Sequence, residues 1–150
     1  MQDKILNPLN MDNTYFSVPQ DKIDTLSEGY IGNLPSIHWF LQDFYQLAGG
    51  LISCAKDMMN FLQVFAHLKE SPLTEGIALV QKQHFQDINS GESIGLGVGI
   101  YEDYYMHTGG TNGFSSTFIV KPADDKGNGG EISLVLLTLL LTSRICQQNC

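Results

Sequence analysis

One stretch of the chain, residues 104–116, constrains the fold more than any other. An aromatic, strand-like run at 104–106 leads into His107, Thr108, Gly109 and Gly110, and a second strand-like run begins at residue 114. The two glycines carry no Cβ, so another backbone or a ligand can approach them closely. Asn-Gly at 112–113, between the two runs, is a strong signal for a β-hairpin turn. A plain hairpin and a functional segment are both compatible with this pattern.

The charge and hydropathy of the chain argue against two classes of partner. Eight basic and 16 acidic residues give a net charge of −8, and no Lys/Arg cluster interrupts the acidic background. Nucleic acid and anionic membrane surfaces are therefore not expected partners. The apolar run at 132–141 is about ten residues long, whereas a membrane span needs roughly 20. We expect it to be a buried strand, and we find no signal peptide within these residues.

No metal and no cofactor is expected. The cysteines Cys54, Cys146 and Cys150 lack Cys-x-x-Cys spacing, so they indicate neither a zinc site nor a disulfide framework. We expect free thiols, although Cys146 and Cys150 could pair in an oxidised tail. His84 has no second histidine or carboxylate at ligand spacing. The glycine-rich run at 94–101 is not followed by Lys-Ser/Thr or a helix, as a phosphate loop would be.

Apolar periodicity predicts two helices in the first part of the chain. The clearer one covers residues 53–68, with Ser53 as N-cap and Asp57 near the positive end of the helix dipole. The second is expected from about Thr74 to Phe85. One apolar stripe lies along the first helix: Met58, Phe61, Leu62, Phe65 and Leu68.

Strand-like runs fill the second part of the chain. Residues 94–101 alternate glycine with aliphatic residues, which is typical of a strand with one bare face, and residues 131–142 form the last and most apolar strand. A helical region followed by strands and short turns indicates an α+β fold with an antiparallel sheet. We expect one domain with a mainly helical region over 1–93, antiparallel strands over 94–142 and a tail over 143–150.

An aromatic cluster around Trp39 precedes the double glycine at 49–50. It could form a substrate wall, but core packing is the expected account, because aromatic residues dominate protein cores.

Three groups of residues follow one another in a recognisable order. Residues 5–14 contain Pro-Leu-Asn-Met followed by Thr14, residues 48–53 read Ala-Gly-Gly-Leu-Ile-Ser, and 95–98, 107–110 and 113–116 form a His-Thr-Gly-Gly strand with its neighbours. Together they resemble the serine β-lactamase and penicillin-binding protein family, in its class C, DD-carboxypeptidase and esterase branch. In that family the first group reads Pro-Leu-Gly-Met-x-x-Thr, so Asn10 replaces a glycine. The resemblance extends to about Thr138.

The resemblance implies a role for each residue of the 107–110 segment. His107 would take the family's Lys/His position, where it helps to hold a substrate carboxylate and tunes nearby proton transfers. Thr108 would offer its hydroxyl to the same carboxylate, and Gly109 would leave room for the acyl chain. The backbone N–H of Gly110 would be one arm of an oxyanion hole. His107 and Gly110 are thus the expected catalytic residues, and Thr108 and Gly109 the expected substrate-binding residues.

Two motifs of the family have no convincing counterpart in the chain. These are the Ser-x-x-Lys that carries the nucleophile and the Tyr-x-Asn that carries the acid/base. Residues 53–56 match Ser-x-x-Lys as a string, but Ser53 already fits the family's helix start, so we interpret the match as structural. The resemblance therefore covers the C-terminal portion of the fold, and residues 1–6 look like the last turns of a helix.

The leading hypothesis is the C-terminal part of a serine hydrolase that uses acyl-enzyme chemistry on a β-lactam, a D-alanyl peptide or an ester. Without a nucleophile it would be inactive by itself, and its expected partner is a small-molecule or peptide substrate. One alternative is a non-catalytic binding module, and another is a structural fragment whose strand at 132–141 exposes an apolar edge. Proteins of the family are often periplasmic or extracytoplasmic. The substrate, the compartment and the oligomeric state do not follow from the sequence.

Overall fold

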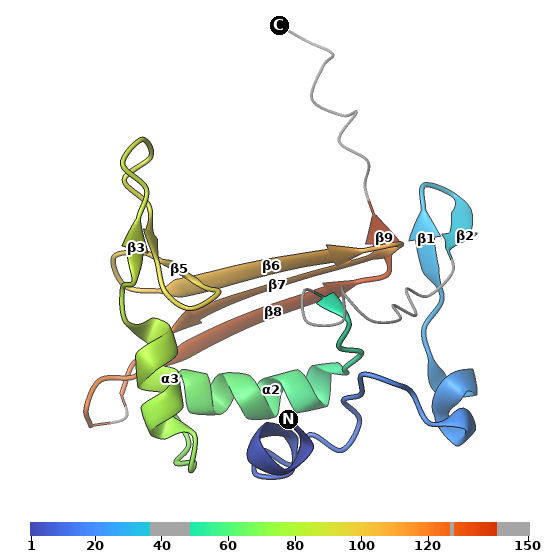
Figure 1. The fold of residues 1–150 in the computed structure, drawn as a ribbon, viewed down its shortest axis with the longest axis horizontal. Helices are drawn as coiled ribbons and strands as arrows, with labels where there is room; N and C mark the ends of the chain where they lie inside the picture. The colour runs from blue at the N-terminus through green and yellow to red at the C-terminus, as the bar shows by residue number, and fades with distance from the viewer. Residues whose placement is uncertain (37–48, 127, 141–150) are drawn as a thin grey trace, which may run out of the picture. The chain divides into compact units, whose positions relative to one another are not determined.

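The computed structural model describes residues 1–36, 49–126 and 128–140 (Figure 1). The aromatic cluster around Trp39 and the tail after residue 140 lie outside the described residues. The chain divides into two compact units. The first consists of Met1–Thr14, Ser53–Thr108 and Thr117–Val135, and the second of Tyr15–Ile52, Gly109–Ser116 and Leu136–Cys150.

A six-stranded sheet runs in simple sequential order, β3-β4-β5-β6-β7-β8. The register is antiparallel between β3 and β4, between β4 and β5, and between β5 and β6. The expected α+β fold with antiparallel strands is therefore confirmed. The strands are β3 (Phe85–Gln86), β4 (Ser93–Ile94), β5 (Gly99–Ile100), β6 (Tyr105–Thr111), β7 (Phe114–Lys121) and β8 (Glu131–Leu137).

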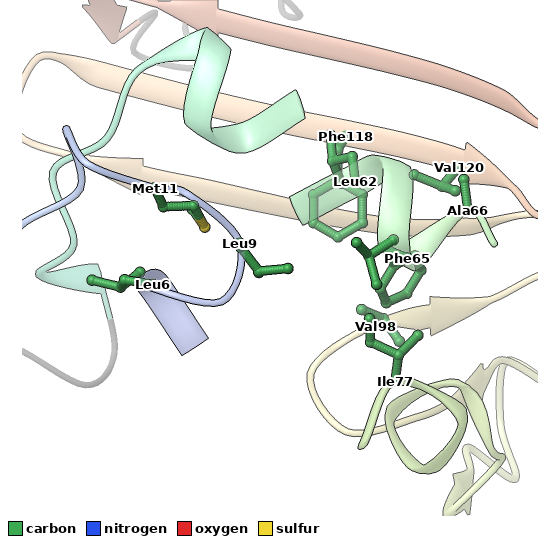
Figure 2. Packing of buried hydrophobic residues seen from close by; sticks show 11 residues of the cluster. Leu6, Leu9, Met11, Leu62, Phe65, Ala66, Ile77, Val98, Phe118 and Val120 are labelled. Carbon is green, nitrogen blue, oxygen red and sulfur yellow. The ribbon is translucent and has the colours of Figure 1, made fainter. Parts of the chain in front are cut away.

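Helices of the first unit contribute part of its hydrophobic core, together with the sheet and loops. They are a π-helical turn, η1 (Gln2–Leu6), and the α-helices α2 (Ala55–Phe65) and α3 (Thr74–Gln81). Helix α2 buries Leu62 and Phe65 against the sheet, as the apolar stripe predicts (Figure 2). The Phe65 ring packs edge-on against Tyr105 of β6 and Phe118 of β7, with centroids 5.6 and 5.9 Å away. In the described residues no helix is long and apolar enough to span a membrane.

The prediction that Ser53 is the N-cap of the first helix is wrong. Cys54 occupies the N-cap position, and no side chain caps the helix there. The Ser53 Oγ is instead hydrogen-bonded to the Thr14 Oγ1 at 2.8 Å. Asp57, in the first turn of the helix, holds the Thr14 hydroxyl in place. The helix ends at Phe65 rather than at 68, since His67 adopts a left-handed backbone with φ 60°.

The second helix also ends earlier than predicted, at Gln81 instead of Phe85. Lys82 is already extended, and the N–H of His84 donates to the carbonyl of Ile94. Phe85 therefore begins strand β3. A pairing partner in the sheet has overridden local helix propensity at this point.

Residues 94–101 form a hairpin, so the prediction of a single strand is wrong. Strands β4 and β5 pair antiparallel, with Ile94 opposite Gly99. Gly97 has φ 79°, a left-handed conformation that suits glycine in a tight turn. The N–H of Leu96 at this turn donates to the carbonyl of Val80, next to the end of α3. The glycines thus mark a turn and not a bare face.

The predicted last strand is split and only partly buried. Residues 131–142 give β8 and then β9 (Leu139–Leu140), with residues after 140 outside the described part. Ile132 and Leu134 pack against the core, whereas Val135, Leu136 and Leu137 are each more than two-fifths exposed. Among the described strands β8 has a single sheet neighbour, β7. This agrees with an apolar strand edge and corrects the expectation of a buried strand.

The second unit holds a 3₁₀ helix, η2 (Gln20–Thr25), and a small sheet of order β2-β1-β9. Strand β1 (Gly29–Ile31) pairs antiparallel with β2 (Leu34–Ser36) and parallel with β9. Gly113 lies directly against β1, where its carbonyl accepts from the N–H of Tyr30 at 3.3 Å. A Cβ on Gly113 would come within 2.6 Å of the Tyr30 backbone nitrogen. This position therefore excludes any side chain.

Loss of the Leu62 side chain is expected to destabilise the first unit. Leu62 is fully buried, so Leu62→Ala leaves a cavity that typically costs about 2–5 kcal/mol. Leu79→Ala on α3 is the control, because Leu79 is 53% exposed and its loss should change stability by about 0.5 kcal/mol or less. Urea unfolding followed by circular dichroism measures both. Equal losses in the two variants would contradict the packing described for α2.

Gly113→Ala is expected to cost more than Gly97→Ala. The two glycines have similar positive φ values, 76° and 79°, so alanine adds the same backbone strain at both. Only at Gly113 does a Cβ also meet backbone atoms within 3 Å, whereas at Gly97 nothing lies within 4 Å. The extra overlap should cost about 1–3 kcal/mol. Thermal or urea unfolding of the pair isolates this difference, and an equal loss would show that β1 does not contact the hairpin tip.

Candidate functional site

The β6–β7 hairpin carries every residue predicted for the site. Strand β6 ends at Thr111 and β7 begins at Phe114, so the loop has two residues, as Asn112-Gly113 predicts. A two-residue loop pairs Thr111 with Phe114 and therefore places Gly109 opposite Ser116 and His107 opposite Phe118. The space around Gly109 agrees with this register, because a Cβ there would lie 2.8 Å from the Ser116 Oγ.

The structure leaves all four predicted residues, His107, Thr108, Gly109 and Gly110, exposed on one strand. Successive side chains of a strand point to opposite faces. His107 therefore shares a face with Tyr105, whose ring contacts Phe65 of α2. Thr108 belongs to the other face of the strand. The imidazole of His107 and the hydroxyl of Thr108 are neighbours along the backbone but leave it in opposite directions.

Among the described strands, none pairs with the edge of β6 beside Thr108 and Gly110. The N–H of Tyr101 donates to the carbonyl of Tyr104, and Gly99 is paired with Met106. Bonded and non-bonded positions alternate along an antiparallel ladder, so the N–H groups of Thr108 and Gly110 point to the same edge as that of Met106. Within the described ranges no strand pairs with this edge beyond Met106, because β5 consists only of Gly99–Ile100.

Two neighbours of the predicted site residues were not assigned a role from the sequence. The Ser116 hydroxyl lies over the Cα of Gly109, and the Phe118 ring lies 6.0 Å from the His107 ring, centroid to centroid. Both follow from the register of a two-residue hairpin, which Asn112-Gly113 already indicates. Counting across the turn from Thr111 and Phe114 would have found them.

The serine of the Ser53-x-x-Lys56 string is hydrogen-bonded to Thr14 within the fold. The Thr14 Oγ1 donates to the Asp57 Oδ2 at 2.9 Å, so the Ser53 hydroxyl must be the donor in its 2.8 Å bond to Thr14. Asp57 is fully buried and also accepts from the N–H of Asn13 at 2.7 Å. In the described part of the chain no hydrogen bond joins Lys56 to Ser53. These contacts support the structural interpretation of the string.

One ion pair lies near the start of β6, between the residue two positions before the strand and the last residue of β7. Lys121 forms a 2.7 Å ion pair with Asp103, and its hydrogen bond to that carboxylate raises the pKa of Lys121. Burial raises the pKa of Tyr105, so its phenol stays protonated at neutral pH. Among the described residues no group of three or more His, Cys, Asp or Glu could hold a metal ion.

Comparison with solved structures identifies similar folds in longer proteins. A class C beta-lactamase from Rhodobacter sphaeroides matches 95% of this chain with a TM-score of 0.77 and 18% identity, but 49% of its own length is covered. A beta-lactamase/D-alanine carboxypeptidase from Pseudomonas syringae (TM-score 0.75, 19% identity) is matched over 93% of this chain and 47% of its own. A D-alanine carboxypeptidase from Burkholderia cenocepacia (TM-score 0.78, 16% identity) matches 94% of this chain and is covered over 50% of its own length. The chain spans about half the length of these structures.

Sequence comparison gives the family directly. No curated protein matches the chain. The family model described as Beta-lactamase matches residues 1–143, which is nearly the whole of the 150 residues. The chain therefore belongs to the beta-lactamase family.

Proposed function

We propose that residues 107–110 of β6 form one wall of an acyl-transfer site in a serine hydrolase that acts on a β-lactam, a D-alanyl peptide or a small ester. The observation that carries this proposal is the exposed strand edge at which the N–H groups of Thr108 and Gly110 have no strand partner among the described residues. Such an edge can bind an extended ligand through main-chain hydrogen bonds. Membership of the beta-lactamase family supports acyl transfer as the chemistry.

Each residue of the segment has a separate task in this proposal. The N–H of Gly110 donates to the carbonyl oxygen of the ligand, where negative charge develops during acyl transfer. A carboxylate or ester group bound at the edge of β6 is held by the Thr108 hydroxyl from one face of the strand and by the His107 imidazole from the other, and the imidazole also serves proton transfer. Gly109 keeps the strand narrow, with the Ser116 hydroxyl beside it as a further polar contact.

Residues 1–150 are expected to bind the ligand without turning it over. Covalent catalysis requires an activated nucleophile, and the one Ser-x-x-Lys string uses its serine hydroxyl to hold Thr14. The similar solved structures are about twice as long as this chain. A nucleophile supplied by further polypeptide would complete the site, whereas binding without any nucleophile would make the chain a recognition module.

Binding of an N-acylated D-alanyl-D-alanine peptide should depend on the N–H of Gly110. Titration followed by amide NMR shifts is expected to move the resonances of Thr108 and Gly110. Gly110→Pro removes the donor at an unpaired edge, where proline is tolerated, and should weaken binding by roughly tenfold, the effect of one lost hydrogen bond. Gly110→Ala keeps the N–H and has nothing nearer than the Phe114 carbonyl at 4.0 Å, so its affinity should stay close to that of the parent.

The control separates loss of the donor from disturbance of the strand. If the proline and alanine variants bind equally, Gly110 is not a donor to the ligand. If the peptide moves no amide of β6 at millimolar concentration, the proposed site is wrong.

A fluorescent penicillin should leave no covalent label on the 150-residue chain. The reason is that the Ser53 hydroxyl is half-buried and hydrogen-bonded to Thr14. Intact-protein mass spectrometry measures the label, and Ser53→Ala provides the unreactive control. A label that maps to Ser53 and disappears in the alanine variant would show that Ser53 is a nucleophile after all.

A further inference from the structure

We propose that Phe118 of β7 is a positioning residue for His107, and that it holds the imidazole in a single orientation at the strand surface. The two rings lie 6.0 Å apart, centroid to centroid, with 34° between their planes. This is within the range of aromatic ring contacts. The inference rests on the proposed function in one respect, namely that His107 contacts the ligand.

The register of the hairpin makes this contact specific. His107 and Phe118 are directly opposite each other on the same face of the sheet, given the two-residue loop between Thr111 and Phe114. Side chains in such cross-strand pairs are the closest neighbours that a sheet provides. A ring at residue 118 therefore lies beside the imidazole as long as the hairpin keeps its register.

Phe118 is itself held in place from the other side. It is 8% exposed, and the Phe65 ring packs against it at 5.9 Å with an interplanar angle of 62°. Phe65 is 1% exposed and has further ring contacts, with Phe61 at 5.8 Å and with Tyr105 at 5.6 Å. A buried residue with neighbours on several sides stays in one rotamer. Phe118 is thus a rigid support that links helix α2 to an exposed residue of the site.

His107 needs such a support because no polar group of the described residues orients it. In acid–base sites the base is usually oriented by a third group through a hydrogen bond. Over residues 1–36, 49–126 and 128–140, no hydrogen bond or ion pair holds the imidazole. An exposed side chain with no contact would sample three staggered χ1 rotamers. The ring of Phe118 is the contact that selects among them.

The test compares Phe118→Leu with Phe118→Tyr and with Phe61→Leu. Leucine removes the ring but keeps an apolar side chain, tyrosine keeps the ring, and Phe61→Leu removes a ring that also packs on Phe65. The readout is the set of three-bond NMR couplings that report χ1 of His107, assigned by their loss in His107→Gln. We expect couplings of one rotamer in the parent, Phe118→Tyr and Phe61→Leu, and rotamer-averaged couplings in Phe118→Leu. Unchanged couplings in a folded Phe118→Leu would overturn the proposal.

Peptide binding distinguishes failure of this proposal from failure of the proposed function. If the D-alanyl-D-alanine peptide binds, Phe118→Leu should weaken it by roughly threefold to tenfold, because a mobile side chain must then be ordered on binding. If the couplings change as expected but the parent does not bind the peptide, the positioning role stands and the function is wrong. If the peptide binds the parent and Phe118→Leu equally well, the positioning role is wrong and the function stands.

Discussion

The packing of Phe65 against Tyr105 and Phe118 is the contact on which the position of β6 depends. An isolated helix as short as α2 is marginal in water, and so is an isolated two-stranded hairpin. Each becomes stable when its apolar face is buried against the other. Because Phe65 is 1% exposed and contacts both strands of the hairpin, it couples the helix to the strand that carries the site. The proposed site segment is therefore exposed, while the hairpin that carries it packs against helix α2.

A second constraint fixes the start of α2. Asp57 accepts from the N–H of Asn13 and the hydroxyl of Thr14, across a sequence separation of 44 and 43 residues. Asn10, with φ 53°, turns the chain in this corner, and its carbonyl accepts from the Asn60 side chain at 3.1 Å. Hydrogen-bond donors offset the cost of burying a carboxylate, and here both donors reach Oδ2, while Oδ1 has no hydrogen-bond partner among the described residues. This explains in physical terms why the corner at residues 8–14 and the helix start at 53–57 occur together, and why Ser53 serves Thr14 rather than the helix end.

Local signals in the sequence predicted the parts of the fold that local physics decides. Asn112-Gly113 predicts the hairpin, and the apolar stripe predicts the core face of α2. The errors lie where a distant partner decides the outcome. Helix α3 ends at Gln81 because the N–H of His84 donates to the carbonyl of Ile94. The run at 94–101 folds back because the N–H of Leu96 donates to the carbonyl of Val80. Neither partner can be identified from periodicity.

The site shows the same division between local and distant causes. His107, Thr108, Gly109 and Gly110 are consecutive, so the sequence alone brings them together. Whether their strand has a free edge depends on how far β5 extends beside it, which is a tertiary property. The contact between Phe118 and His107 is likewise a tertiary property, because Phe118 packs between Phe65 of α2 and His107 of β6.

The open edge of β6 and the hairpin formed by the glycine-rich run at 94–101 have one common cause. If β5 continued backward from Gly99 in the register that pairs Gly99 with Met106, residues 97 and 98 would pair with Thr108 and His107. Gly97 prevents this, because its positive φ turns the chain toward β4, and the N–H of Gly95 then bonds to the carbonyl of Val98. Val98 is buried in the core, which fixes the turn in place. The glycines at 95–99 therefore do not provide a bare strand face for a ligand. They end β5 early, and this leaves the N–H of Thr108 without a strand partner in the described structure.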